Sequence, residues 1–437
     1  MLTILRDRTY RHLFAAQVIA LLGTGLMTVA LGLLAYELAG ADAGAVLGTA
    51  LAIKMIAYVG VAPVAQAFTD RLPRRSVLVA LDLVRGAIAL CLPFVTEIWQ
   101  IYLLIFLLQA ASAAFTPTFQ ATIPDILPKE EDYTRALSLS RLAYDLESLV
   151  SPMLAAALLS VISFHSLFAG TVIGFFASAA LVLSVRLPSQ QPAARRGVWD
   201  RTTRGIRLYL ATPRLRGLLA ISLTVAAAGS MVIVNTVVLV KADFGLSEPQ
   251  VALALAAFGA GSMVAALTLP RLMDRLSDRP VMIAGAAALI VGTASGMVVG
   301  SYGALLVLWL ILGFGYSVAQ TPAGRLLRRS AHAEDRPAIF AAQFALSHAC
   351  WLICYPLAGY LGARAGMTAA FAAMAIIGLI GLALAWRLWP AGDPTDVAHD
   401  HSGLPVDHPH LREYGGMGRH HHPLVIDDLH RRWPVGP

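Results

Sequence analysis

The sequence predicts an all-α membrane protein with twelve transmembrane helices arranged as two six-helix repeats. Three observations predict it: about a dozen long apolar runs, basic residues concentrated in every second gap between them, and short motifs that recur at one spacing. Apolar residues make up 57% of the 437 residues and charged residues only 14%. A soluble globular domain carries about 25% charged residues, so this chain is expected to lie in a lipid bilayer.

A helix that crosses the hydrocarbon core needs roughly 20 mostly apolar residues. Helices are expected because lipid offers no hydrogen-bonding partner to an open strand edge. The predicted spans are residues 13–36, 44–68, 76–95, 99–117, 137–160, 166–185, 217–240, 250–272, 280–299, 303–322, 338–362 and 367–389. The first run is too long for a signal peptide and another span follows at once, so we expect an uncleaved first helix.

The distribution of basic residues predicts the orientation. The N-terminus, the even-numbered gaps and the C-terminal tail, counted with the adjoining span ends that carry Arg271 and Arg387, hold 28 of the 33 lysines and arginines, whereas the odd-numbered gaps hold only Lys241 and Arg364. Loops rich in lysine and arginine stay on the cytoplasmic side. Both termini are therefore predicted to be cytoplasmic, in the inner (cell) membrane. The same asymmetry explains the net charge of +7 without a nucleic-acid partner.

Short motifs recur at an offset of 204 residues. Asp70-Arg71-Leu72 is repeated as Asp274-Arg275-Leu276, and Ser151-Pro152 in the fifth span corresponds to Tyr355-Pro356 in the eleventh. A shared offset indicates a duplicated six-span unit, as in one large class of secondary transporters. The predicted parts are an N-terminal half at 1–186, a cytoplasmic linker at 187–216, a C-terminal half at 217–390 and a disordered histidine-rich tail at 391–437.

The loop from Asp70 to Arg75 resembles the signature loop of the major facilitator superfamily. It departs from the family pattern, because Gln66 stands where the family usually has glycine and Pro73 replaces a second glycine. The resemblance implies the major facilitator fold. It also implies a cytoplasmic gate formed by Asp70, Arg71, Arg74, Arg75, Asp274 and Arg275. The segment 140–148 and the histidine-rich tail are similar to the nickel-resistance exporters of this superfamily.

Six charged residues lie within predicted spans and away from the span ends, where charge is costly and therefore a candidate for function. They are Lys54, Asp82, Arg85, Arg141, Asp145 and Glu147. Asp82 and Arg85 are three positions apart and are predicted to form a structural pair on one helix face. Arg141 and Asp145, four positions apart, can also pair, and the sequence leaves a structural and a functional interpretation open.

Glu147 differs from the other intramembrane acids. No basic residue lies three or four positions away on its own helix, so its partner must be another helix, a proton or a bound cation. A salt bridge to Lys54 is the structural alternative. Otherwise Glu147 is the leading proton-coupling and transport residue, with Asp145, Lys54 and Arg141 beside it. Burial favours the neutral form of a carboxyl group, which would let Glu147 exchange a proton for a cation.

The tail carries the predicted metal ligands. Its eight histidines are His399, His401, His408, His410, His420, His421, His422 and His430. Such a composition is typical of metal-binding tracts, and imidazole binds divalent ions with affinity rising toward nickel and copper. His348 in the eleventh span is a further candidate ligand, although a hydrogen-bonded core histidine is the alternative. Cys350 and Cys354 are predicted to pack as small apolar residues.

The predicted function is a proton-coupled antiporter that exports a divalent transition metal, nickel first and cobalt or zinc next, and confers metal resistance. The alternative is an exporter of organic compounds such as drugs or siderophores, which a cavity rich in aromatic residues and poor in carboxylates would favour. A metal sensor or store is a third hypothesis, which the two gate loops disfavour. No enzyme, catalytic residue or cofactor is predicted, because the chain has neither a His-Glu-x-x-His motif nor a P-loop. The expected partners are the bilayer, the metal ion and protons; no protein partner is predicted.

Overall fold

The computed structural model is a helical bundle, as predicted. It describes residues 2–61, 72–187, 198–273, 276–332, 335–392, 396–399, 420–423, 425–427, 430 and 433. Among these residues, ten helices are long and apolar enough to cross a membrane. The first of them, Arg8–Gly60, is 53 residues long and contains two predicted spans. The predicted fifth span lies on the helix Glu130–Leu159, of which the described part Val150–Leu159 is apolar.

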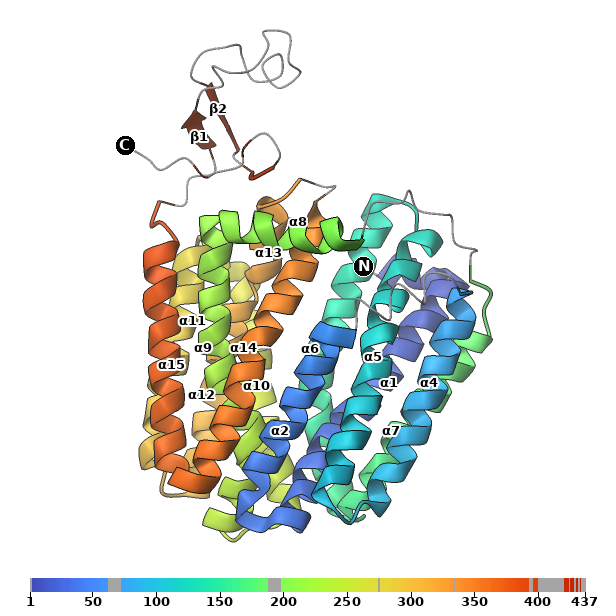
Figure 1. Ribbon diagram of the computed structural model, residues 1–437, viewed down its shortest axis with the longest axis vertical. Helices are drawn as coiled ribbons and strands as arrows, with labels where there is room; N and C mark the ends of the chain where they lie inside the picture. The colour runs from blue at the N-terminus through green and yellow to red at the C-terminus, as the bar shows by residue number, and fades with distance from the viewer. Residues whose placement is uncertain are drawn as a thin grey trace.

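The described residues of the N-terminal half form six helices (Figure 1). They are α1 (Arg8–Ala39), α2 (Ala43–Ile56), α4 (Arg74–Cys91), α5 (Ile98–Ile126), α6 (Glu130–Leu159) and α7 (Leu167–Leu183). Helix α2 continues as a π-helical segment, η3 (Ala57–Val61), and 3-10 turns lie at η1 (Leu2–Arg6), η2 (Gly40–Asp42), η4 (Leu92–Phe94) and η5 (Phe164–Ser166). Asp7 caps α1 by accepting a 2.7 Å hydrogen bond from the Tyr10 amide, as acidic N-caps do.

The C-terminal half repeats this arrangement after a linker helix. Its elements are α8 (Val198–Ala211), α9 (Pro213–Val238), the π-helical η6 (Leu239–Asp243), α10 (Glu248–Met273), α11 (Asp278–Ser295), η7 (Gly296–Val298), α12 (Tyr302–Gln320), α13 (Ala323–Arg329), α14 (Arg336–Ala365) and α15 (Met367–Leu388). The turn between α14 and α15 is made by Gly366, whose φ of +84° suits glycine. Helix α8 lies within the linker predicted at 187–216.

The two halves meet mainly through two helix pairs, α2 with α14 and α6 with α10, and α9 also contacts α1 and α2. The described chain ends lie at the upper end of the bundle in Figure 1, which we call the terminal face. The lower end, where α1 turns into α2, is called the opposite face. One large apolar cluster contains residues of both halves, so the interface between them belongs to the core.

The buried pair predicted at Asp82 and Arg85 is present on α4. Asp82 is fully buried, forms a salt bridge with Arg85 and accepts a 2.7 Å hydrogen bond from the Ser178 hydroxyl on α7. The Arg85 guanidinium carbon lies 3.9 Å from the Phe115 ring centroid and 4.5 Å from that of Phe175. The pair therefore ties α4 to α5 and α7 inside the N-terminal half, away from the interface between the halves.

Substituting Asp82 by Ala is expected to destabilise the protein by about 3 kcal/mol, because it leaves a buried guanidinium without its counterion. Thermal unfolding in detergent micelles measures this. The double variant Asp82→Leu/Arg85→Met should recover most of the loss, since an apolar pair of similar volume needs no counterion. Arg135→Ala, at the more exposed pair with Asp132, is the control and should cost below about 1 kcal/mol. Equal losses at both sites would contradict the structural role of Asp82.

The described parts of the tail carry regular structure that the sequence analysis did not expect. Strand β1 (Asp396–His399) pairs antiparallel with β2 (His420–Pro423), placing His399 opposite His420 in the register. Further on, Ile426 is 2% exposed and belongs to the main apolar cluster, and the Trp433 ring lies 4.8 Å from the Arg214 guanidinium carbon. Apolar side chains in this otherwise polar segment anchor its end on the C-terminal half.

Candidate functional site

Three ionisable residues from both halves come together at the interface. Lys54 lies on α2, Glu147 on α6 and His348 on α14, and all three are half-buried. The charge of Lys54 interacts with both Glu147 and His348. Within the described chain, Glu147 forms no hydrogen bond or salt bridge, so the Lys54–Glu147 ion pair considered as the alternative is not formed. The two charges are neighbours without direct contact.

Glu147 is held against a glycine of the first helix. A Cβ atom at Gly25 would lie 3.2 Å from Glu147 Oε1 and would collide with the Ser151 side chain, one turn further along α6. Ser151 is fully buried, and its hydroxyl has no hydrogen-bond partner in the described residues. Gly25 therefore opens the space in which the carboxylate and the hydroxyl sit. The resulting polar wall belongs entirely to the N-terminal half.

The C-terminal half places aromatic residues at the corresponding positions. At the 204-residue offset, Lys54 corresponds to Phe258, Glu147 to Trp351 and Ser151 to Tyr355. The geometry is repeated as well, because a Cβ at Gly229 would collide with the Trp351 ring just as one at Gly25 would meet Ser151 and Glu147. Polar groups thus line one half, and aromatic rings occupy the same places in the other.

These rings form a continuous aromatic wall. The ring centroids of Trp351 and Tyr355 are 4.9 Å apart, and those of Phe258 and Tyr316 are 5.5 Å apart in an edge-to-face arrangement. The Tyr316 and Tyr355 side chains are close enough to interact electrostatically, so the two pairs are neighbours. Such geometries are the favoured ones between aromatic rings. The wall therefore presents a firm apolar surface in the C-terminal half.

A second aromatic group joins the halves directly. Tyr58, in the π-helical end of α2, lies 5.8 Å from Phe344 and 5.9 Å from His348 by ring centroid. Phe344 and His348 are 3.9 Å apart, and His348 Nδ1 is 2.7 Å from the Phe344 carbonyl oxygen. His348 is thus a hydrogen-bonded histidine within an aromatic stack, which is the alternative that the sequence left open for it.

The described residues offer little to a divalent metal. Within them, no group of three or more His, Cys, Asp or Glu side chains could hold a metal ion. The positive charge of Lys54 acts on both the carboxylate and the imidazole and would repel a divalent cation there. Cys350 and Cys354 are buried in the apolar cluster. The side chains of Arg141 and Asp145, although on α6, lie outside the described residues.

The tail histidines are described only in part. His430 is 8% exposed, and its Nδ1 atom lies 3.1 Å from Asp427 Oδ1, while Asp427 Oδ2 is also 3.4 Å from His332 Nε2. His399 and His420 to His422 are described as strand backbone only. His401, His408 and His410 lie outside the described residues. Metal binding by the tail stays a prediction.

The predicted gate residues that the structure describes form braces at the terminal face. Arg74, at the start of α4, forms a salt bridge with Asp125 near the end of α5, and Arg75 donates to the Leu183 carbonyl of α7. The C-terminal half has the same brace with its charges exchanged, since Asp278 lies 3.4 Å from Arg329 at positions 204 residues later. Asp70, Arg71, Asp274 and Arg275 lie outside the described residues.

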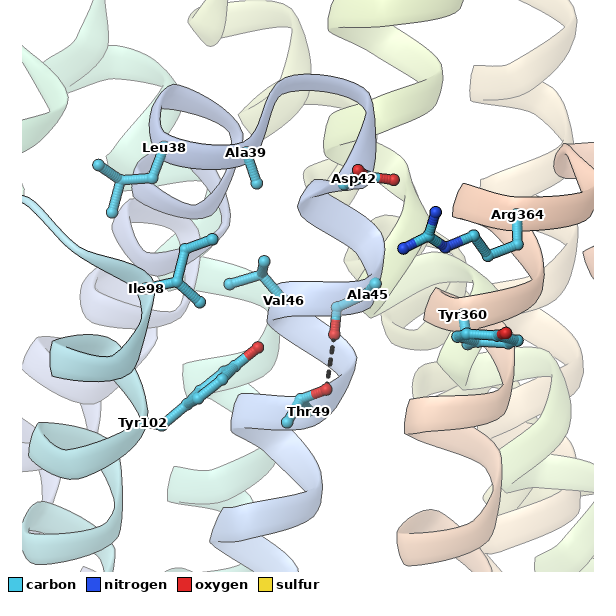
Figure 2. Close-up of a pocket in the computed structure, with 10 residues that line it drawn as sticks. All are labelled: Leu38, Ala39, Asp42, Ala45, Val46, Thr49, Ile98, Tyr102, Tyr360 and Arg364. Carbon is cyan, nitrogen blue, oxygen red and sulfur yellow. Dashed lines mark hydrogen bonds between the residues drawn. The ribbon is translucent and has the colours of Figure 1, made fainter.

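A pocket of about 490 Å³ opens at the opposite face between α2, α5 and α14 (Figure 2). It is lined by Leu38, Ala39, Asp42, Ala45, Val46, Thr49, Ile98, Tyr102, Tyr360 and Arg364. Figure 2 shows the side chains of Asp42 and Arg364 pointing toward each other across its mouth. It is separate from the polar and aromatic walls, because Gly44, Gly48 and Gly359 close the interface between them.

Two similar helical halves around a central interface with intramembrane charges define a secondary transporter. A family model described as the Major Facilitator Superfamily matches residues 13–238 and again 218–423. The second match begins close to 204 residues after the first, as the internal repeat predicts. The chain therefore belongs to the Major Facilitator Superfamily. It is a multi-pass membrane transporter and not an enzyme.

Curated relatives and solved structures are similar to this chain at low identity. Macrolide efflux protein A of Streptococcus pyogenes is 25% identical over 181 residues, which is 40% of this chain and 44% of that protein. The corresponding Enterococcus faecalis protein is 27% identical over 152 residues, 32% of this chain and 47% of that protein. The chain thus matches less than half the length of these efflux proteins. An uncharacterized MFS-type transporter of Bacillus subtilis, YfiS, is 22% identical over 299 residues, 64% of this chain and 69% of that protein.

Two solved structures share the fold. The bacterial homolog of the human lysosomal transporter Spinster has a TM-score of 0.69 at 13% identity, covering 88% of this chain and 96% of that one. The nucleoside transporter NupG has a TM-score of 0.68 at 16% identity, covering 87% and 98%. Likeness at this identity concerns the fold alone.

The sequence analysis found Lys54, Glu147 and His348 but missed the aromatic wall. An aromatic residue in an apolar span has no signal of its own, since most such residues only pack. The signal that was present is the repeat, because the 204-residue offset leads from Glu147 directly to Trp351.

Proposed function

We propose that this protein exports bulky organic compounds that combine a flat apolar part with a polar or charged group. Its termini lie in the cytoplasm, as the basic loops indicate. Alternating access would move the two halves around the site between α2, α6, α10 and α14. This is the alternative that the sequence analysis kept beside nickel export.

The observation that carries the proposal is the difference between the two halves at equivalent positions. Lys54, Glu147 and Ser151 on one side correspond to Phe258, Trp351 and Tyr355 on the other. Ligand sites for organic molecules are mostly apolar and aromatic, with a few polar groups that fix orientation. A ring of the substrate would stack on the aromatic wall while its polar group faces Glu147 and Lys54. The macrolide efflux relatives support an organic substrate and the outward direction of transport.

A divalent metal fits the same site less well. A metal ion needs several converging donors, whereas the described site offers one carboxylate and one imidazole with an ammonium close to both. The aromatic wall offers no strong metal ligand. The relatives add no support for nickel, cobalt or zinc. We therefore place the organic exporter ahead of the metal exporter.

We propose that Glu147 carries the coupling proton. It has no hydrogen-bond partner in the described residues, so its carboxyl group is free to take up a proton or to face a cationic substrate. Lys54, on α2 of the same half, places a positive charge near this carboxylate. The transport cycle would then exchange a proton for an organic substrate across the membrane.

Everted membrane vesicles test the function under an imposed proton gradient. We expect uptake of a macrolide and of an aromatic organic cation, each accompanied by proton movement in the opposite direction. Nickel, cobalt and zinc should move no faster than in vesicles without the protein. Nickel transport without movement of either organic probe would overturn the proposal and restore the metal exporter. A chain ending at Pro390 separates the tail from the transport site, and it should retain organic transport.

A further inference from the structure

The two halves are sealed at the opposite face by glycines. Gly44 and Gly48 in the first turns of α2 face Gly359 and Tyr355 on α14. The backbones of Gly44 and Gly359 touch, and a Cβ atom at Gly48 would lie 2.5 Å from the Tyr355 carbonyl oxygen. We call these four residues the glycine seam. It must separate whenever the interface opens toward this face.

Asn235 on α9 points into the glycine seam with an unsatisfied acceptor. The residue is fully buried. Its Nδ2 atom donates a 3.1 Å hydrogen bond to the Ala358 carbonyl oxygen, which fixes the orientation of the amide. Its Oδ1 atom accepts no hydrogen bond in the described residues. Cβ atoms at Gly44 and Gly362 would lie 2.6 Å and 3.0 Å from Oδ1, so glycine Cα–H groups, which are weak donors, lie against it.

The contacts of this amide divide between the halves. Ala358 and Gly362 belong to the same half as Asn235, so the hydrogen bond from Nδ2 survives when the halves move apart. Gly44 belongs to the other half, so the close contact with Oδ1 is lost when α2 withdraws. The pocket of Figure 2, lined by Ala45 and Tyr360 beside the glycine seam, would then bring water to Oδ1.

We propose that the glycine seam is the gate at the opposite face and that Asn235 promotes its opening. A buried acceptor without a donor destabilises the closed seam, and opening satisfies it with water. The glycines supply close packing that closes the gate, and the amide oxygen prevents that packing from becoming too stable to reopen. Asn235 contacts Met231, Ala358, Gly44 and Gly362, none of which belongs to the polar or aromatic walls, so it acts on the balance of conformations and not on substrate contact.

Spin-label distances between Ala41→Cys and Ala365→Cys, two exposed positions at the opposite face, measure this balance in a Cys91→Ser background. The parent chain without the new cysteines serves as the labelling blank. Asn235→Leu should lower the population open at this face by about tenfold, because the unsatisfied acceptor is gone. Asn235→Asp should raise it, since a carboxylate is costlier still to bury. With transport as the readout, Asn235→Leu should lower kcat at an unchanged KM.

Glycine substitutions test the same gate in a second way, which does not depend on whether the Asn235 variants fold. Gly44→Ala should raise the open population, because its Cβ would lie 2.6 Å from Oδ1. In an Asn235→Ala background the same substitution should have a much smaller effect. Gly32→Ala is the matched control, since its Cβ would meet only Leu47 Cδ2, at 3.7 Å. The proposal is overturned if Asn235→Leu and Asn235→Asp shift the population in the same direction, or if Gly44→Ala behaves like Gly32→Ala.

Discussion

Glu147→Gln is expected to abolish proton-coupled transport while the protein remains folded. Glutamine has the same shape but cannot exchange a proton, so the substitution removes the chemistry and keeps the packing over Gly25 and Ser151. We expect a loss of about 100-fold or more in gradient-driven transport, the scale found when a proton-transferring group is removed. Thermal unfolding in detergent should be nearly unchanged, because Glu147 forms no hydrogen bond or salt bridge in the described chain.

Glu37→Gln is the matched control for this prediction. Glu37 lies near the end of α1 with a half-exposed side chain, 3.8 Å from His165 and away from the walls of the site. It should transport at the parental rate. Substrate exchange without a gradient should persist in Glu147→Gln if the substrate site is intact. Gradient-driven transport by Glu147→Gln at the parental rate would remove Glu147 from the proposed mechanism.

Trp351→Ala is expected to weaken the affinity for organic substrates by about tenfold to 100-fold, because a stacking partner worth roughly 1–3 kcal/mol is removed. The loss should appear in KM and in substrate-induced quenching of tryptophan fluorescence, with kcat less affected. Trp351→Phe retains a ring and should recover much of the affinity. Proton coupling should remain, since Glu147 is unchanged.

Gly229→Ala tests the same wall without removing the ring. The Cβ introduced at position 229 would collide with Trp351 of α14 and displace its indole ring from its packing against α9. We therefore expect a similar rise in KM. Trp99→Ala is the control, because Trp99 is 61% exposed on the outer surface of α5. An unchanged KM for both Trp351→Ala and Gly229→Ala would mean that substrates do not use the aromatic wall. Export of a divalent metal would then be the favoured hypothesis.

The buried pair on α4 illustrates what spacing along one helix can predict. Asp82 and Arg85 are three residues apart, and their contact is set by helix geometry alone. Neither Phe115 and Phe175, which stack on Arg85, nor Ser178, which bonds Asp82, could be predicted, because they come from α5 and α7. The helices that enclose a side chain are chosen by tertiary packing, which has no fixed sequence period.

The sequence by itself determined the spans, the two repeats and the charged residues that sit in the membrane. The length of an apolar run, the placement of arginines and a constant offset are local properties, and the bilayer makes them decisive. The tertiary structure decided which of these groups meet. It placed Lys54 near Glu147 without a salt bridge between them. It packed Trp351 over Gly229, as Glu147 packs over Gly25, and it placed the Asn235 side-chain oxygen against Gly44 of the other half. Those contacts join helices far apart in the chain, and their geometry depends on close packing between backbones that no local pattern encodes.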